Sequence, residues 1–449
     1  MRLLVLFTAV FACLTLASPH QASAHAEYDH SDPPANAVLP VSPGQVSIWF
    51  TERLERSGTT AQLYDQDGKQ VPGVTTAPGD GPKAMIVKLP PNLPNGTYSV
   101  VWETLSADDG HPAQGYFAFT VGTEANVATV IPPAAATSTS APQWLRATSR
   151  WIALLGLALA VAVWPIWLLV LRFGVSPASN DGHEVIPQIR RYAVAAILLA
   201  VAGNLFALAV QAADLPSGGY WHNLWTVVAH TRYGRLWIAR IVLLALYTVG
   251  LAFVAWWWPR RKPWRSAIVV LLALALPLPF SLISHASAEN VGRTTAIAID
   301  YLHVLGASLW VGGVFLLVAV LTPVVMQFDR ENRAIVLRRI LPRFSAVALA
   351  AWGVMGLSGL YAAWLHVGNL TGLTTTSYGK ALLLKQLVLL PLLALGAFNL
   401  LIVTRKLRQG QTESASPESS RWARHFRVAI IAESVLMVVL MLVIGQLIS

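Results

Sequence analysis

The sequence predicts a small all-β domain followed by an all-α membrane domain of about eight helices. The first observation is composition: 55% of the residues are hydrophobic and only 12% are charged, whereas about a quarter of a soluble chain is charged. The second is a change of pattern, from short alternating runs before residue 123 to long apolar runs after residue 143. We therefore expect four parts: a signal peptide (1–24), a β domain (25–123), a linker (124–143) and a transmembrane domain (144–449).

The first 24 residues resemble a cleaved secretory signal. Arg2 precedes the apolar run "LLVLFTAVFACLTLA", and Ala22-Ser23-Ala24 supplies small residues at the cleavage site. Cleavage after Ala24 would make His25 the new N-terminus, while the alternative cut after Ala26 would discard it. Cys13, the only cysteine, lies inside the signal. The mature chain would then contain neither disulfides nor thiolate metal ligands.

Residues 25–123 show the pattern of short strands. Apolar side chains alternate in segments such as "VSIWF" and "YSVVW", and "DQDGK", "APGDGPK" and "LPNGT" provide turns between them. This predicts a Greek-key barrel or sandwich. The linker, rich in Ala, Thr, Ser and Pro, leads from it to the membrane.

Long apolar segments fill the remaining chain. Each is long enough to cross the roughly 30 Å hydrocarbon layer of a bilayer. We place eight spans near residues 151–171, 192–213, 236–258, 266–284, 296–325, 344–365, 381–404 and 428–448. Gly306, Gly312 and Gly313 in the fifth predict close helix packing.

Charge predicts the orientation and the environment. Residues 25–125 hold 12 acidic and 5 basic side chains, whereas residues 126–449 hold 10 acidic and 26 basic ones. An exported N-terminal domain places the basic loops on the cytoplasmic side, in agreement with the positive-inside rule. We expect a multi-pass protein of the cytoplasmic membrane with its β domain on the extracytoplasmic side. Its partners would be lipid and cations rather than nucleic acid.

A metal site is predicted in "SADDGHPAQGYFAF". Asp109 and His111 are two residues apart, so an extended backbone would direct both side chains to one face. With the ring and terminal amine of His25 nearby, three nitrogens and one oxygen would suit tetragonal Cu(II), with zinc as the main competitor. The alternative is an ordinary turn in which Asp109 caps backbone groups before Gly110.

The β domain resembles the CopC family of periplasmic copper-binding barrels. The resemblance rests on "HAEYDHSDPPANAVL", "QVSIWFTERLE" and "SADDGHPAQGYFAFTVG". It implies that His25, Asp109 and His111 are the Cu(II) ligands, with His25 binding through its amine and Nδ1. Asp108 beside Asp109 leaves open which carboxylate binds the metal.

The membrane half resembles the CopD family. "IDYLHVLGASLWVGG", "LPRFSAVALAAWGVMGLSGLYAAW" and "TTTSYGKALLLKQLVLLPLLALGAFN" carry this resemblance. A CopC part joined to a CopD part is the arrangement of YcnJ-type fusions, which are associated with copper acquisition.

Polar residues in spans are costly and therefore candidates for function. His285 and His303 are the candidate ligands of a membrane entrance, with His222, His230 or His366 as helpers. Asp300 shares a helical face with His303, so these two could instead form a self-contained pair. Met355, Met437 and Met441 could bind Cu(I) or simply pack.

We expect a binding and transport protein rather than an enzyme, because no nucleophile elbow accompanies the Ser, Asp and His of "SADDGH". No P-loop is present, so active transport would draw on an ion gradient, the membrane potential or a copper sink. Cu(II) would be captured outside and passed to or across the membrane, for import, homeostasis or resistance. One alternative is a membrane redox protein that uses histidine-ligated haem or copper to reduce Cu(II). Another is a copper-storing sensor or assembly protein.

Overall fold

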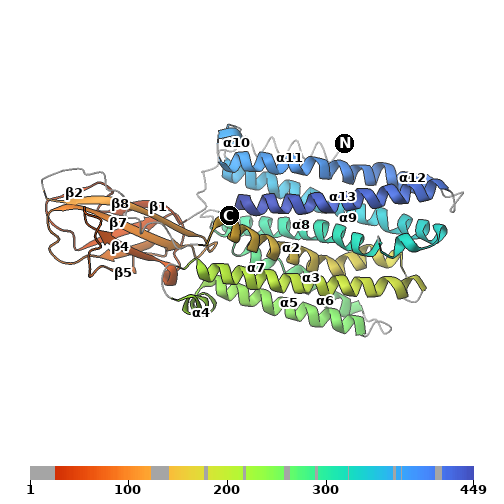
Figure 1. Ribbon diagram of the computed structural model, residues 1–449, viewed down its shortest axis with the longest axis horizontal. Helices are drawn as coiled ribbons and strands as arrows, with labels where there is room; N and C mark the ends of the chain where they lie inside the picture. Colours follow the sequence, from red (N-terminus) through yellow and green to blue (C-terminus); the bar gives the residue numbers. More distant parts are fainter. Residues whose placement is uncertain are drawn as a thin grey trace.

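The computed structural model shows a β-sandwich at one end of an elongated helical bundle (Figure 1). It describes residues 26–122, 141–175, 180–215, 219–256, 263–288, 292–321, 323–367, 371–375, 377–409 and 417–448. The predicted signal peptide, His25 and residues 124–140 of the predicted linker lie outside these ranges.

The predicted all-β domain is confirmed as two four-stranded sheets. One has the order β1-β3-β6-β5 and the other β2-β8-β7-β4. The strands are β1 (Tyr28–Asp32), β2 (Val38–Leu39), β3 (Gln45–Phe50), β4 (Thr60–Tyr64), β5 (Thr75–Pro78), β6 (Ala84–Lys88), β7 (Gly96–Leu105) and β8 (Pro112–Val121). Alternation directs Val46, Ile48 and Phe50 into the core between the sheets.

The β7–β8 hairpin carries the loop of interest. The two ten-residue strands pair antiparallel until Leu105 faces Pro112, so residues 106–111 form the connection. Ser106 N donates to His111 O at 2.9 Å, and Gly110 N donates to Ser106 O at 3.0 Å. Gly110 has φ +77°, a conformation that favours glycine. This tip faces the helical bundle.

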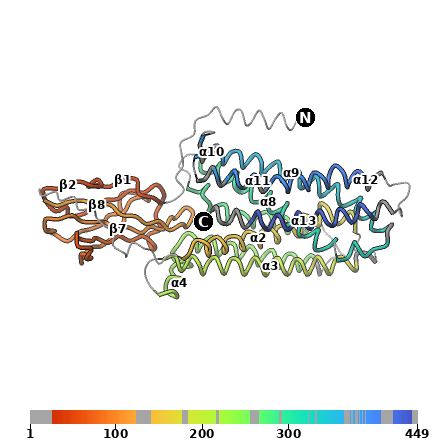
Figure 2. Tube along the Cα trace, turned by 45° about the horizontal axis from the view of Figure 1, so that its top comes forward, coloured from red at the N-terminus to blue at the C-terminus, as the bar shows by residue number. Residues whose placement is uncertain are grey.

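The helical half contains long, nearly parallel helices (Figure 2). The principal ones are α2 (Gln143–Leu169), α3 (Asn180–Ala213), α5 (Arg232–Trp256), α8 (Arg293–Leu321), α9 (Arg330–Val367), α11 (Ser377–Phe398) and α13 (Pro417–Ile448). Its shorter elements are η3 (Leu171–Phe173), α4 (Tyr220–His230), α6 (Pro263–Ala275), α7 (Leu278–Ser281), η4 (His285–Ser287), η5 (Val325–Gln327), α10 (Gly372–Thr375), η6 (Asn399–Val403) and α12 (Thr404–Gln409). The short helix η1 (Arg56–Gly58) belongs to the β domain, between β3 and β4.

The predicted count of eight spans is not confirmed. Among the described residues, six helices are long and apolar enough to cross a membrane. The predicted fourth span, 266–284, is shorter than expected because α6 ends at Ala275, before Pro277 and Pro279, and α7 follows as a separate turn. The predicted eighth lies in α13, which is not among the six.

Close packing centres on α2, which is buried on most of its surface. A Cβ built on Gly312 of α8 would lie 2.1 Å from the carbonyl oxygen of Ala158, and one on Gly156 would lie 2.5 Å from the backbone of Ala200. Glycine therefore permits these helices to approach closely. Large apolar side chains remain exposed on the outer faces of the bundle, as contact with lipid requires, including Leu198, Val249, Leu271 and Leu387.

Candidate metal centre at the domain junction

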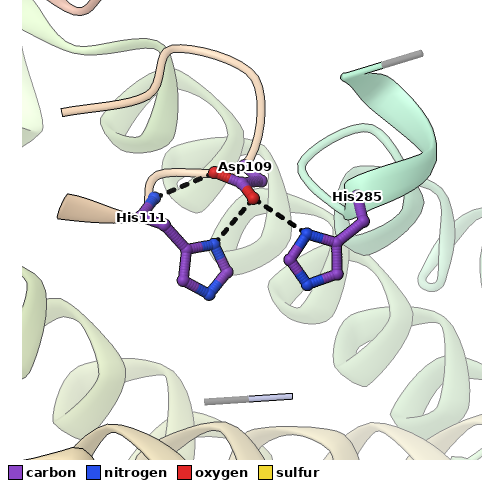
Figure 3. Close-up of side chains that lie close together, drawn as sticks. All are labelled: Asp109, His111 and His285. Carbon is purple, nitrogen blue, oxygen red and sulfur yellow. Dashed lines mark hydrogen bonds and ion pairs between the residues drawn. The ribbon is translucent and has the colours of Figure 1, made fainter. Parts of the chain in front are cut away.

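Asp109, His111 and His285 form a cluster between the two halves (Figure 3). Asp109 and His111 belong to the β7–β8 loop, whereas His285 begins η4 in the helical half. Each offers one ligand atom, and these three atoms lie within 4.8 Å of one another. It is the one such group of three or more His, Cys, Asp or Glu residues among those the structure describes.

The two oxygens of Asp109 have different roles. Oδ1 accepts a hydrogen bond from the backbone N–H of His111 at 3.0 Å. Oδ2 faces Nδ1 of His111 at 2.7 Å and Nδ1 of His285 at 2.9 Å. The predicted turn cap and the predicted carboxylate–imidazole pair are therefore both present. The loop is a turn rather than the extended segment that we expected.

The imidazole rings lie against each other on one side of the carboxylate. The rings of His111 and His285 stack with centroids 5.0 Å apart and an interplanar angle of 16°. On the opposite edge of His111, Nη1 of Arg150 lies 2.6 Å from Nε2. Arg150 belongs to α2, so the helical half contributes both His285 and the guanidinium group that contacts Nε2 of His111.

Burial shapes the electrostatics of the loop. Asp109 and His111 are 5% and 7% exposed. Burial, followed by the charge of Arg150, lowers the pKa of His111 to about 4 and keeps the ring neutral. Burial tends to raise the pKa of Asp109, but the contacts with His111 and His285 outweigh it and hold this pKa well below its usual range. A carboxylate and neutral imidazoles are the forms that bind metal.

Asp108 has a separate role. Its Oδ1 accepts from Nε of Arg53 at 2.8 Å and from Nη2 of Arg293 at 3.0 Å, and Nη1 of Arg232 lies 4.0 Å away. Two of these arginines belong to the helical half. We call Asp108, Arg53, Arg232 and Arg293 the arginine latch. The carboxylate of Asp108 is already engaged by guanidinium groups. Of the two neighbouring carboxylates, the geometry therefore favours Asp109 as the metal ligand.

Further contacts fix the loop on the bundle. Nη1 of Arg232 donates to the carbonyl oxygens of Ala107 and Asp108 at 2.8 and 2.9 Å. Nε2 of Gln211 donates to Gly110 O at 2.9 Å, and Ser287 Oγ donates to Asp108 O at 2.5 Å. Leu105 packs in an apolar cluster with residues of the helical half: Leu208, Ala212, Leu215 and Val227. The tip is thus held by charged, polar and apolar contacts together.

The remaining predicted candidates lie elsewhere or are not described. His25 lies outside the described residues. Nδ1 of His303 lies 2.8 Å from Ser358 Oγ, whereas Asp300 accepts from Ser284 Oγ at 3.2 Å. The expected Asp300–His303 pair therefore has different partners. His222 and His230 are exposed on α4, the side chain of His366 is not described, and Met437 is buried in the apolar core.

Comparison with known proteins assigns both halves. The CopC domain model matches residues 28–122, the model of the copper resistance protein D-like N-terminal domain matches residues 142–295, and that of copper resistance protein D matches residues 338–447. The chain is a fusion of the CopC and CopD families. The predicted family assignment is therefore confirmed.

Among the relatives, one is similar to most of the CopC–CopD fusion, and others are similar to one part of it. The copper transport protein CutJ of Bacillus subtilis is 29% identical over 92% of this chain and 74% of its own length. Copper resistance protein C of Escherichia coli is 31% identical over 24% of this chain and 90% of that protein. The inner membrane protein YebZ of Escherichia coli is 29% identical over 43% of this chain and 62% of that protein. Together they indicate a multi-pass bacterial membrane protein that handles copper.

Proposed function

We propose that this protein captures Cu(II) outside the cytoplasmic membrane and passes it from the β domain to the membrane half at His285. The observation that carries this proposal is the shared carboxylate: one oxygen of Asp109 faces an imidazole from each half, at 2.7 and 2.9 Å. A metal moving between the halves would need ligands from both. We propose that the copper moves inward, as part of copper homeostasis; that copper is transported at all is in keeping with the similarity to the copper transport protein CutJ.

The donor atoms suit the proposed cargo. Two imidazole nitrogens and one carboxylate oxygen belong to the ligand types of Cu(II) and of zinc, and copper(II) leads the divalent affinity order. A nitrogen-rich set disfavours Ca²⁺ and Mg²⁺, which prefer oxygen ligands. The proposed Cu(II) site therefore consists of Asp109, His111 and His285, together with the amine and ring nitrogens of His25.

We propose His25 as the fourth ligand residue because of where the next residue, Ala26, lies. Thr104 Oγ1 donates to the carbonyl oxygen of Ala26 at 3.0 Å, and Thr104 lies on β7 shortly before the metal loop. Ala26 is fully buried there. Adding one residue before His25 should change the Cu(II) EPR spectrum, because it disrupts chelation by the terminal amine and ring. An identical spectrum would remove His25 from the ligand set.

The proposed orientation follows from charge. The β domain lies at one end of the bundle, and α12, whose sequence TRKLRQ has three basic residues, lies at the other (Figure 1). Basic loops favour the cytoplasmic face. The junction would then lie at the extracytoplasmic surface, where Cu(II) arrives.

The experiment compares His285→Ala with His222→Ala, whose side chain is exposed on α4. The full chain in nanodiscs is titrated with Cu(II) against a competing chelator, and cytosolic copper is measured in copper-limited cells. We expect His285→Ala to weaken Cu(II) affinity by about tenfold or more and to lower cytosolic copper, while His222→Ala matches the wild type. Unchanged affinity and cytosolic copper in His285→Ala would overturn the proposal.

His303→Ala tests passage beyond the junction. Because His303 contacts Ser358 between α8 and α9 rather than the cluster, its loss should reduce cytosolic copper while leaving Cu(II) affinity unchanged. Unchanged cytosolic copper would exclude His303 from the path. An absorbance spectrum of the same purified protein addresses the redox alternative, since a haem Soret band would favour that function.

A further inference from the structure

Arg150 makes an unusual contact for a residue beside a metal ligand. Its Nη1 lies 2.6 Å from Nε2 of His111. Metal-binding histidines ordinarily donate their second nitrogen's hydrogen to a carboxylate, a carbonyl or water. Here Nε2 of His111 faces a guanidinium group, which can donate hydrogen bonds but cannot accept them.

The contact determines which nitrogen of His111 carries the hydrogen. A guanidinium group only donates, so Nε2 must accept from Arg150. The hydrogen of the neutral ring then lies on Nδ1, where it faces Oδ2 of Asp109 at 2.7 Å. Protein groups therefore lie beside both nitrogens of His111 in this arrangement: Oδ2 of Asp109 at Nδ1 and Nη1 of Arg150 at Nε2.

Copper on His111 conflicts with this arrangement at either nitrogen. If copper replaces the hydrogen on Nδ1, the neutral ring carries its hydrogen on Nε2, directly opposite the N–H of Arg150. Two donors cannot share that 2.6 Å contact. If copper binds Nε2, it takes the position of the guanidinium. In both cases Arg150 must withdraw, and its charge repels the divalent cation.

We propose that Arg150 is a positioning residue that competes with copper for His111 and thereby favours transfer to His285. The inference rests on the proposed function. Arg150 belongs to α2 of the membrane half, so it meets His111 only when the β domain is docked. Docking would bring both the acceptor His285 and the competitor Arg150 to the metal. Copper is then released from His111 toward the membrane half rather than back into solution.

The test measures Cu(II) affinity of the full chain in nanodiscs against a competing chelator. The variants are Arg150→Gln, Arg150→Lys and the control Arg146→Gln. Arg146 lies one turn earlier on α2 and contacts Asp214 at 3.3 Å. We expect Arg150→Gln to bind Cu(II) about tenfold more tightly or better, because competition and repulsion are both removed. Arg146→Gln should match the wild type.

The outcomes separate this inference from the proposed function. Tighter binding would not follow from a merely structural role, since loss of a structural contact weakens a site. Unchanged or weaker binding by Arg150→Gln, while His285→Ala still weakens binding, overturns the inference and leaves the function intact. No change in either variant overturns the function as well.

Arg150→Lys keeps the test decisive if Arg150→Gln does not fold. The ammonium retains the charge but lacks the planar fork of the guanidinium and reaches less far. Its Cu(II) affinity should lie between those expected for the wild type and Arg150→Gln. Affinity equal to or below the wild type in a folded Arg150→Lys protein contradicts the proposed competition.

Discussion

Asp108 and Arg293 are 185 positions apart in the sequence, yet Nη2 of Arg293 lies 3.0 Å from Oδ1 of Asp108. This contact joins the β7–β8 loop to the first residue of α8. Because Asp109 and His111 follow immediately in the same loop, the arginine latch determines where they meet His285. The latch therefore positions one half of the proposed copper site on the other.

Asp108→Asn should loosen the docking of the two halves. Removing the buried carboxylate leaves three part-exposed guanidinium groups without their anion, which costs less than the roughly 3–5 kcal/mol of a fully buried pair. Spin labels at two exposed positions, Val41 of the β domain and Trp221 of α4, report the separation of the halves by pulsed EPR. We expect one narrow distance distribution in the wild type and a broad one in Asp108→Asn.

The matched control is Asp80→Asn, because Asp80 is an exposed carboxylate of the same domain. Its distance distribution should remain narrow. A narrow distribution in Asp108→Asn would show that the remaining contacts of Arg232, Gln211 and Leu105 suffice for docking.

His111→Ala should abolish tight Cu(II) binding by the full chain. It removes the proposed ligand nitrogen, which lies 2.7 Å from the carboxylate, and leaves Asp109 with one imidazole. Titration against a chelator should show a loss on the order of a hundredfold. His30→Ala is the control, since His30 is exposed and stacks on Trp49. Equal affinities in the two variants would exclude His111 as a ligand.

Glu52→Gln should stabilise the protein in a pH-dependent manner. Burial, followed by the charge of Asp109, raises the pKa of Glu52 to about 8. Between the ordinary carboxyl pKa and about pH 8, the unfolded chain releases a proton that the folded protein keeps, so wild-type stability falls as pH rises. Glutamine removes this loss, which is on the order of 3 kcal/mol at neutral pH.

Thermal unfolding midpoints at several pH values provide the measurement. The advantage of Glu52→Gln should be absent at about pH 4, where both states are protonated, and largest near pH 8. Exposed Glu27→Gln serves as the control and should leave the midpoint unchanged. An advantage that is constant with pH would mean that Gln acts through packing instead.

Gly312→Ala should destabilise the bundle. The added Cβ would lie 2.1 Å from Ala158 O and 2.6 Å from Ala162 Cβ, so α8 would have to move away from α2. Such overpacking costs roughly 1–3 kcal/mol or more. Gly353→Ala is the matched control, because nothing lies within 4 Å of its added Cβ. Comparable unfolding midpoints for both variants would show that the α2–α8 contact yields easily.

Local patterns predicted the parts of the protein that local physics determines. Alternation at Val46, Ile48 and Phe50 requires no knowledge of distant contacts, and Asp109 and His111 are neighbours along the chain. The predicted span 266–284 is not confirmed, because α6 ends before Pro277 and α7 begins directly after it, and hydropathy alone does not register a break in the helix.

Contacts between the halves were beyond local patterns. His285 was predicted as a membrane entrance, but its contact with Asp109 depends on docking. Arg53, Arg150, Arg232 and Arg293 were missed as site residues, because an arginine in a loop or in the first turns of a helix has many ordinary uses. Glu52 was also missed, although it accepts from Ser106 Oγ at the base of the metal loop. Arg232 and Arg293 stand at the starts of α5 and α8. A charged residue at such a position was the one sequence signal that could have pointed to these site residues.

The residues of the arginine latch come from distant parts of the chain. The latch therefore also determines when the proposed copper site can form during biosynthesis. A chain is made from its N-terminus, so the β domain emerges with Asp108 and Arg53 while Arg232 and Arg293 do not yet exist. These arginines, and His285 between them, appear only with α5, η4 and α8. A nascent protein therefore cannot assemble the shared site until the central helices have been made, and the proposed copper transfer becomes available only after Arg293 has been synthesised.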